Sequence, residues 1–248
     1  MKRILAAIAF FITLVLPAIA QKPASSKVKL TENSVVKDTS GTTFPYAIWN
    51  KLLYTGRYSI RPEYPQLENT AFIITRLSDE EFEKRMTSLP KPKESKYFKT
   101  GSSFSHFKAR DITGKKINTK ELAGKTIVLN FWFINCPPCQ KEIPDLHQLT
   151  ETFKEDSSIV FLAVALDQKH ELKDFLKTHP FGYKIIDDGR YISNQYGLNS
   201  YPTNVVISPD GKVYFHSSGL SSNTVYWLKK SIEELRQTAL KNEPAGTD

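Results

Sequence analysis

The sequence predicts an α/β fold in which helices flank both faces of a central mixed sheet, with a small α/β extension before it. Three observations carry this prediction. In the second half of the chain, apolar runs with strand character alternate with segments of helical periodicity. A hairpin turn signal at 208–211 adds antiparallel strands near the end. Cys136 and Cys139 form a Cys-x-x-Cys where the most apolar strand passes directly into a helical pattern.

Length and composition are those of a globular protein with one large or two small domains. The chain has 248 residues, of which 40% are hydrophobic and 24% charged, with a net charge of +8. The basic residues are scattered and form no long run or Arg-rich helix. This pattern argues against nucleic acid as a partner.

The first twenty residues have the pattern of a secretory signal. A basic start is followed by a short apolar core and then by Ala18-Ile19-Ala20 before Gln21. The alternative is an uncleaved membrane anchor, but the apolar stretch is shorter than the ~20 residues that usually span a bilayer. We therefore expect cleavage after Ala20, and a periplasmic or cell-envelope location for the mature protein.

The next segment, 21–96, is predicted to be an N-terminal extension with a linker, and 97–248 the main domain. Within the extension, a capping box at 78–81 precedes apolar residues at helical spacing, and prolines and charges at 89–96 are typical of a linker. The other expected elements of the extension are a turn at 38–41, a helix over 44–54 and strands over 58–60 and 71–75.

The main domain begins with an expected strand at 107–112 and a capped helical turn from 118. The run 125–133 is almost continuously apolar, as a strand buried on both faces should be. The remaining expected elements are a helix from Pro137 through Phe153, strands at 159–166 and 183–186, a helix around 172–176, a helical turn at 191–196, strands at 203–207 and 212–216, and a last amphipathic helix at 225–235.

The two cysteines are the only ones in the chain, and their position explains what they can do. If the helix starts at Pro137, Cys136 is its N-cap, and unpaired N–H groups and the helix dipole favour its thiolate. We expect Cys136 to be the exposed nucleophile. Cys139 lies one turn further on, close enough to close a short disulfide with it, so the pair can cycle between dithiol and disulfide.

These residues resemble a known family. Trp132, the Cys-Pro-Pro-Cys and Pro144 are similar to thioredoxin, while Glu142 and Asn130 are similar to the exported thioredoxin-like oxidoreductases of the ResA/TlpA group. The resemblance covers roughly residues 101–240. It implies a thioredoxin-like fold and a protein disulfide reductase with a redox-active disulfide and no other cofactor. It also implies protein substrates, among them apocytochrome c during cytochrome c maturation, and a membrane thiol electron donor.

The resemblance also suggests roles for single residues. Cys139 would be the resolving thiol, and Glu142 would exchange a proton with it, although spacing alone fits a surface carboxylate equally well. Asn130 would point inward beneath the cysteines, where a satisfied core asparagine is the alternative. Pro202 would follow a cis peptide bond beside Cys136, with the backbone of Tyr201 available to a substrate strand.

Three further residues complete the expected site. Trp132 would cover part of it, unless it serves only core packing. Pro137 and Pro138 remove two N–H donors that could otherwise steady the Cys136 thiolate, which favours a reductant over an oxidant.

Two other functions remain open at this point. A thiol peroxidase of this fold generally has Thr or Ser three residues before its reactive cysteine, where this chain has Phe133. A copper or other metal carrier would use both thiols, but copper chaperones of this fold usually space them by three residues. A structural zinc site needs four ligands. The five histidines show no metal-binding spacing, so no metal site is expected.

Overall fold

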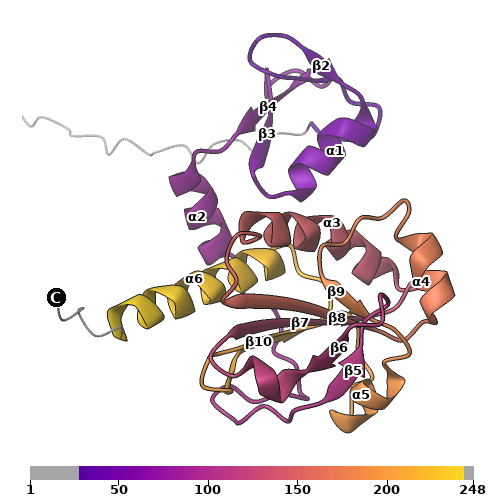
Figure 1. Ribbon diagram of the computed structural model, residues 1–248. Helices are drawn as coiled ribbons and strands as arrows, with labels where there is room; N and C mark the ends of the chain where they lie inside the picture. Colours follow the sequence, from indigo (N-terminus) through magenta and orange to yellow (C-terminus); the bar gives the residue numbers. More distant parts are fainter. Residues whose placement is uncertain (1–27, 243–248) are drawn as a thin grey trace, which may run out of the picture.

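The computed structural model describes residues 28–242, and the predicted signal segment lies outside them. The chain forms a small N-terminal unit and a larger C-terminal domain, with the small unit above the helical layer of the domain (Figure 1). Between residues 28 and 242, no helix is both long and apolar enough to span a bilayer.

A five-stranded mixed sheet forms the centre of the C-terminal domain, in the order β11-β10-β7-β8-β9. Strands β7, β8 and β9 are parallel, and β10 and β11 add antiparallel to them. Its strands are β7 (Thr126–Trp132), β8 (Ile159–Ala165), β9 (Lys184–Ile186), β10 (Thr203–Ile207) and β11 (Val213–Ser218). All seven residues of β7 are buried, which agrees with the apolar run that predicted it.

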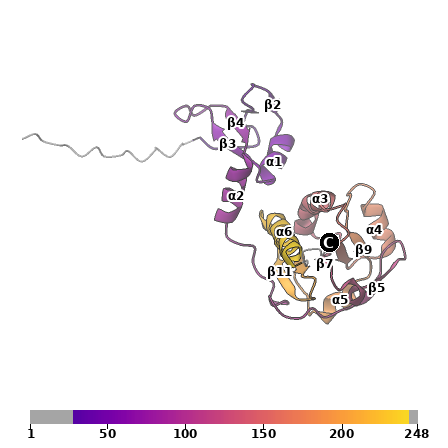
Figure 2. The same cartoon turned by 60° about the vertical axis from the view of Figure 1, so that its left-hand side comes forward.

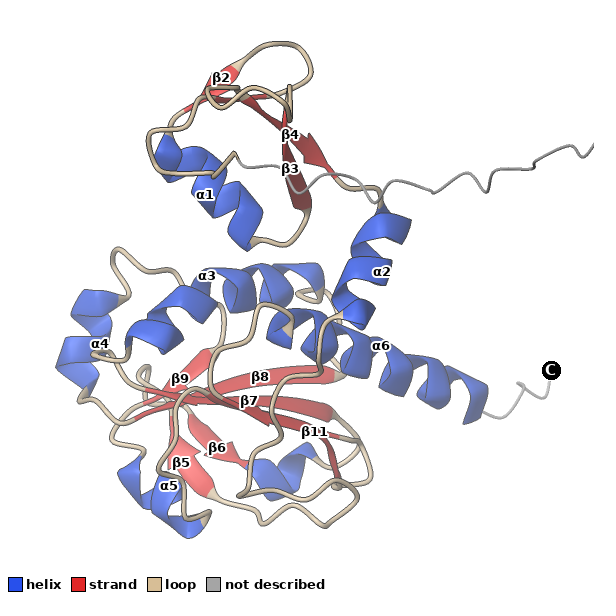
Figure 3. Ribbon diagram, turned by 180° about the vertical axis from the view of Figure 1, so that it is seen from behind, coloured by secondary structure: helices blue, strands red, loops and turns tan. Residues whose placement is uncertain are grey.

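Helices cover both faces of this sheet, as the sequence predicted (Figure 3). One apolar cluster joins the sheet to α3 (Pro137–Thr152), α4 (Lys169–Phe175) and α6 (Thr224–Asn242). The opposite cluster contains Ile192 of α5 (Arg190–Gln195) and Ile117 of β6. There β5 (Lys108–Arg110) pairs with β6 (Lys116–Asn118), and the 3₁₀-helix η1 (Thr119–Leu122) follows.

The N-terminal unit is a four-stranded sheet with two helices. The strand order is β2-β1-β4-β3. Its elements are β1 (Val36–Lys37), β2 (Thr43–Phe44), α1 (Tyr46–Tyr54), β3 (Tyr58–Pro62), β4 (Phe72–Arg76) and α2 (Asp79–Ser88). The predicted capping box is present, since the Ser78 side chain accepts from Glu81 N–H and the Glu81 carboxylate accepts from Ser78 N–H.

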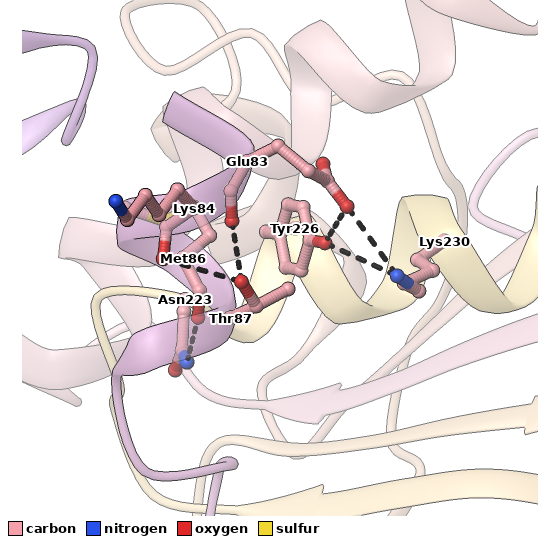
Figure 4. A network of polar contacts seen from close by, with 7 residues as sticks. All are labelled: Glu83, Lys84, Met86, Thr87, Asn223, Tyr226 and Lys230. Carbon is pink, nitrogen blue, oxygen red and sulfur yellow. Dashed lines mark hydrogen bonds and ion pairs between the residues drawn. The ribbon is translucent and has the colours of Figure 1, made fainter. Parts of the chain in front are cut away.

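The two units meet where α2 lies against α6 (Figures 2 and 4). Glu83 accepts a hydrogen bond from the Tyr226 hydroxyl and pairs with Lys230 at 3.3 Å. Asn223, which is buried, donates to the backbone oxygens of Met86 at 3.3 Å and Pro90 at 3.1 Å. Because these bonds end on backbone atoms, they fix the path of the chain where it leaves α2.

The segment that looked like a free linker is instead held along β11. Lys93 O accepts from Ser218 N–H, and Ser95 N–H donates to His216 Nδ1 at 3.0 Å. Burial lowers the pKa of His216, which favours the neutral ring that can accept this bond. Composition alone does not reveal these contacts, because their partners lie more than a hundred residues away in the sequence.

Sequence reasoning missed the shortest strands. Strands β1 and β2 have two residues each, too few for a period to be visible, and β6 stands in a lysine-rich stretch. The last helix is longer than predicted, because α6 runs on to Asn242.

Candidate active site

The cysteine pair stands at the start of α3, at the end of the most buried strand. Cys136 is the N-cap of α3 with Pro137 at its first position, as predicted. The two cysteines form a disulfide, and their Cα atoms are 5.2 Å apart. Cys136 Sγ accepts the Cys139 N–H at 3.3 Å, so an N–H of the first helical turn already points at this sulfur. In the dithiol state the same N–H and the helix dipole would stabilise a Cys136 thiolate.

The expected exposure of Cys136 is wrong for this disulfide state. Cys136 is only 3% exposed and Cys139 is 1% exposed. Both belong to the apolar cluster that fills the α3 face of the sheet, and Phe133, Ile134 and Tyr201 pack against that cluster. The N-cap position predicts the electrostatic field at the Cys136 sulfur, but it does not predict which side chains bury that sulfur.

The loop that leads into the cysteines is held by two hydrogen bonds that sequence reasoning did not find. Ile134 N–H donates to the Asp167 carboxylate at 2.7 Å, and Ile134 O accepts from the Gln140 side chain at 2.7 Å. Burial raises the pKa of Asp167, while the bond from Ile134 opposes this. These bonds tie the loop to the segment after β8 and to the first turn of α3, which fixes the position of Cys136.

Glu142 is a buried carboxyl one turn beyond Cys139. It is 2% exposed, and side chains three residues apart on a helix lie on the same side. Burial raises the pKa of Glu142 to about 7, and the nearby Asp145 carboxylate adds to this rise. Its Oε2 accepts a hydrogen bond from Asn204 Nδ2 at 3.0 Å, which lowers the pKa in opposition. A carboxyl with a pKa near neutrality can both take and return a proton.

Asn130 lies inward from β7, as expected, and its partner is a residue that sequence reasoning missed. Asn130 Nδ2 donates to Asn204 Oδ1 at 2.9 Å, and the two residues are direct partners across β7 and β10. A signal for Asn204 was present in the sequence. It is the one amide in the strand from Thr203 to Ile207 and directly precedes the apolar residues Val205–Ile207, just as Asn130 is the one amide in its own strand.

The remaining predicted residues lie around this centre. The Tyr201–Pro202 peptide bond is cis. Tyr201 makes an edge-to-face contact with Phe133, at 5.5 Å between ring centroids, which brings the proline loop to the loop before Cys136. Trp132 is fully buried between Phe175 and Phe181, a core position in the same cluster as the cysteines. At the surface above the pair, Pro137 is exposed and Pro138 half-buried.

The N-terminal unit comes within electrostatic range of α3. Burial raises the pKa of Tyr54, and the charges of Asp145 and Glu142 raise it further. Lys51, on the same helix α1, lowers the pKa of Asp145 against the effect of burial. A cavity of about 720 Å³ lies between the units, and its lining includes Asp145 but neither cysteine.

The residues that the structure describes contain no group of three or more His, Cys, Asp or Glu side chains placed to hold a metal ion.

Comparison with known proteins agrees with this geometry. Residues 100–216 match the AhpC/TSA family. The thiol-disulfide oxidoreductase ResA of Bacillus thuringiensis (strain Al Hakam) is 35% identical over 114 residues, which are 46% of this chain and 66% of that protein. ResA of Bacillus subtilis (strain 168) is 31% identical over 114 residues, 46% of this chain and 64% of that protein. The C-terminal domain is ResA-like.

Solved structures support the fold of the ResA-like domain. A putative thiol:disulfide interchange protein DsbE from Chlorobium tepidum covers 56% of this chain and 98% of its own, with a TM-score of 0.51 and 24% identity. A putative protein disulfide isomerase from Bacteroides thetaiotaomicron covers 58% of this chain and 94% of its own, with a TM-score of 0.54 and 20% identity. Since the chain spans just under two thirds of the ResA proteins above, their activity is not transferred on similarity alone.

Proposed function

We propose that this protein is a thiol–disulfide oxidoreductase that reduces disulfides in other proteins. The observation that carries the proposal is the Cys136–Cys139 disulfide at the N-terminus of α3, with the Glu142 carboxyl buried one turn below it. A structural role for this disulfide is a poor explanation, because so short a loop constrains little of the unfolded chain.

The reaction starts from the dithiol. The Cys136 thiolate attacks one sulfur of a substrate disulfide, so that a mixed disulfide forms and the first substrate sulfur leaves as a thiolate that takes up a proton. Cys139 then gives its proton to the Glu142 carboxylate and attacks the Cys136 sulfur. The second substrate sulfur leaves as a thiolate that takes up a proton, and the Cys136–Cys139 disulfide remains. The substrate gains two electrons, which a dithiol donor must later return to the protein.

The reduction potential of the Cys136–Cys139 pair tests whether the protein acts as a reductant or as an oxidant. Pro137 and Pro138 lack N–H groups that could stabilise a thiolate at Cys136, which favours a reductant. We expect equilibration with glutathione or dithiothreitol to give a potential near or below the roughly −270 mV of thioredoxin. A value near the roughly −120 mV of a strong oxidant would make the protein a disulfide donor.

The substrate and the electron donor follow from the resemblance. We propose apocytochrome c as a client, a membrane thiol protein as donor, and a location outside the cytoplasm that the pattern of residues 1–20 supports. Substitution Cys139→Ser should trap clients as mixed disulfides on Cys136, and Cys136→Ser is the matched control. Recovery of the same proteins with both variants would contradict covalent trapping.

A further inference from the structure

A buried chain of three polar side chains runs from β7 to α3 beneath the disulfide. Asn130 Nδ2 donates to Asn204 Oδ1 at 2.9 Å, and Asn204 Nδ2 donates to Glu142 Oε2 at 3.0 Å. None of the three residues is more than 2% exposed. Burying polar atoms costs free energy unless they are hydrogen-bonded. Three such side chains in an apolar core therefore suggest a functional role.

The chain lies on the face of the sheet that carries the cysteines. Side chains alternate along a strand, so Asn130 shares a face with Val128 and Trp132, and Asn204 shares a face with Val206. Those three apolar residues belong to the same cluster as Cys136 and Cys139. The two amides therefore interrupt one continuous apolar stripe, at the point where Glu142 of α3 descends onto it.

The direction of the first hydrogen bond determines the second. Because Asn130 donates to Asn204 Oδ1, the Asn204 amide must turn its Nδ2 toward Glu142. An N–H donor at Oε2 stabilises the ionised carboxylate. With the amide reversed, its oxygen would face Oε2, and only a protonated Glu142 could satisfy it. The orientation of one amide thus selects which form of Glu142 is favoured.

The second carboxyl oxygen is left free for chemistry. Glu142 Oε1 is buried and has no hydrogen-bond partner among residues 28–242. The Asn204 bond holds Oε2, so it also limits rotation of the carboxyl group. Cys139 lies one turn earlier on the same side of α3, and is buried in the same cluster.

We propose that Asn204 is a positioning residue that holds Oε2 of Glu142 and leaves Oε1 to exchange a proton with Cys139, and that Asn130 sets the orientation of the Asn204 amide. This inference rests on the proposed function, because the proton exchange belongs to the thiol–disulfide reaction. In that step the S–H bond of Cys139 breaks and an O–H bond forms at Glu142. The positioning itself is a property of the resting protein.

Titration of Glu142 tests the positioning without any turnover. The Glu142 carboxyl carbon would be followed by carbon-13 NMR in the full-length, disulfide-bonded protein. We expect Asn204→Leu, which keeps volume but removes the donor, to raise the midpoint by about one pH unit. Asn130→Leu should also raise it, because without the Asn130 donor nothing holds Asn204 Oδ1, and the Asn204 amide is free to turn its oxygen toward Glu142.

Thr203→Val is the matched control. Thr203 is the neighbouring residue of β10 and fully buried, and it makes hydrogen bonds to Ser200 O and Ser218 Oγ that do not involve Glu142. Its substitution should leave the Glu142 midpoint unchanged. An unchanged midpoint in folded Asn204→Leu, or an equal shift in Thr203→Val, would overturn the proposal. If Asn204→Leu does not fold, the midpoint in Asn130→Leu, which removes the Asn130 donor without adding a charge, decides the question in the same way.

Reduction of insulin by the dithiol form separates this inference from the proposed function. At pH 7, a midpoint one unit higher leaves about a tenth of Glu142 ionised in place of about half, so Asn204→Leu should slow the reaction about fivefold. The effect should vanish when Glu142→Gln is already present. Equal slowing in both backgrounds would contradict positioning through Glu142. A wild-type protein that reduced no protein disulfide would refute the proposed function, while the NMR shift would still establish the positioning.

Discussion

The N-terminal unit and the ResA-like domain bury different kinds of residue. Between residues 28 and 88, the buried positions are apolar side chains and one glycine, with Trp49 at the centre of a small cluster. The ResA-like domain buries two larger clusters together with amides, hydroxyls and the Glu142 carboxyl. Buried polar groups are costly, and three of them, Asn130, Asn204 and Glu142, form the hydrogen-bonded chain beneath the disulfide. This difference agrees with the proposal that the chemistry belongs to the ResA-like domain, while the N-terminal unit contributes packing and contact.

Substitution of the nucleophile should give the largest effect. We expect Cys136→Ser to lower the rate of insulin reduction at least about 10³-fold, since no other thiol can start the reaction without it. Trp49→Ala, which changes only the N-terminal unit, should retain the activity of the C-terminal domain. Equal losses in the two variants would show that the N-terminal unit takes part in the chemistry.

Loss of the central tryptophan should have the next largest effect, on stability. Trp49 is 4% exposed, and replacing a buried Trp by Ala costs about 3–5 kcal/mol. The N-terminal unit has only a small core, so it should lose its slow amide hydrogen exchange in Trp49→Ala. Strands β7 and β8 should stay protected. Loss of protection throughout the chain would mean that the two units fold as one.

The pH dependence of stability should reveal the buried carboxyl. The pKa of Glu142 is about 7 in the folded protein, above its ordinary value of 4.5. The folded state therefore binds the proton more tightly, so its contribution to stability is complete below pH 4.5 and is lost as the pH rises through 7. The free energy of unfolding should fall over this window by up to about 3 kcal/mol more in the wild type than in Glu142→Gln. Parallel curves in urea titrations of the two proteins would contradict a buried, titrating Glu142.

Sequence predicted the fold well where local pattern and tertiary environment agree. The apolar run at 125–133, the Cys136 N-cap and the capping box at Ser78 each specify their structure from neighbouring residues. The amide of Asn130 was found because it interrupts such a run, yet its partner Asn204 lies 74 residues away. Pairing across strands depends on register, which a single sequence does not contain.

The same limit applies to exposure and to the junction of the units. The N-cap position of Cys136 is local, but its burial depends on side chains that come from other segments, such as Tyr201. Likewise, the capping box and apolar spacing predicted α2, whereas nothing in them pointed to α6 as its neighbour. Asp167 was missed for the same reason, because it follows β8 in the sequence and contacts Ile134 only in the folded chain.

The smallest expected effect is at the surface of the junction. The Glu83–Lys230 pair is partly exposed, with 53% and 34% of the two side chains accessible, and such pairs contribute about 0.2–1 kcal/mol. We expect Glu83→Gln to lower the free energy of unfolding by less than about 1 kcal/mol. This difference should become smaller with added salt, which screens the charges. Asn223→Ala, a few residues before Tyr226, should cost about 1–3 kcal/mol, because it removes a buried donor that pairs with the backbone oxygens of Met86 and Pro90. Urea unfolding of the two variants shows which substitution lowers the free energy of unfolding more. A larger cost for Glu83→Gln would show that the units are joined chiefly by charge, and not by the buried bonds that fix the chain as it leaves α2.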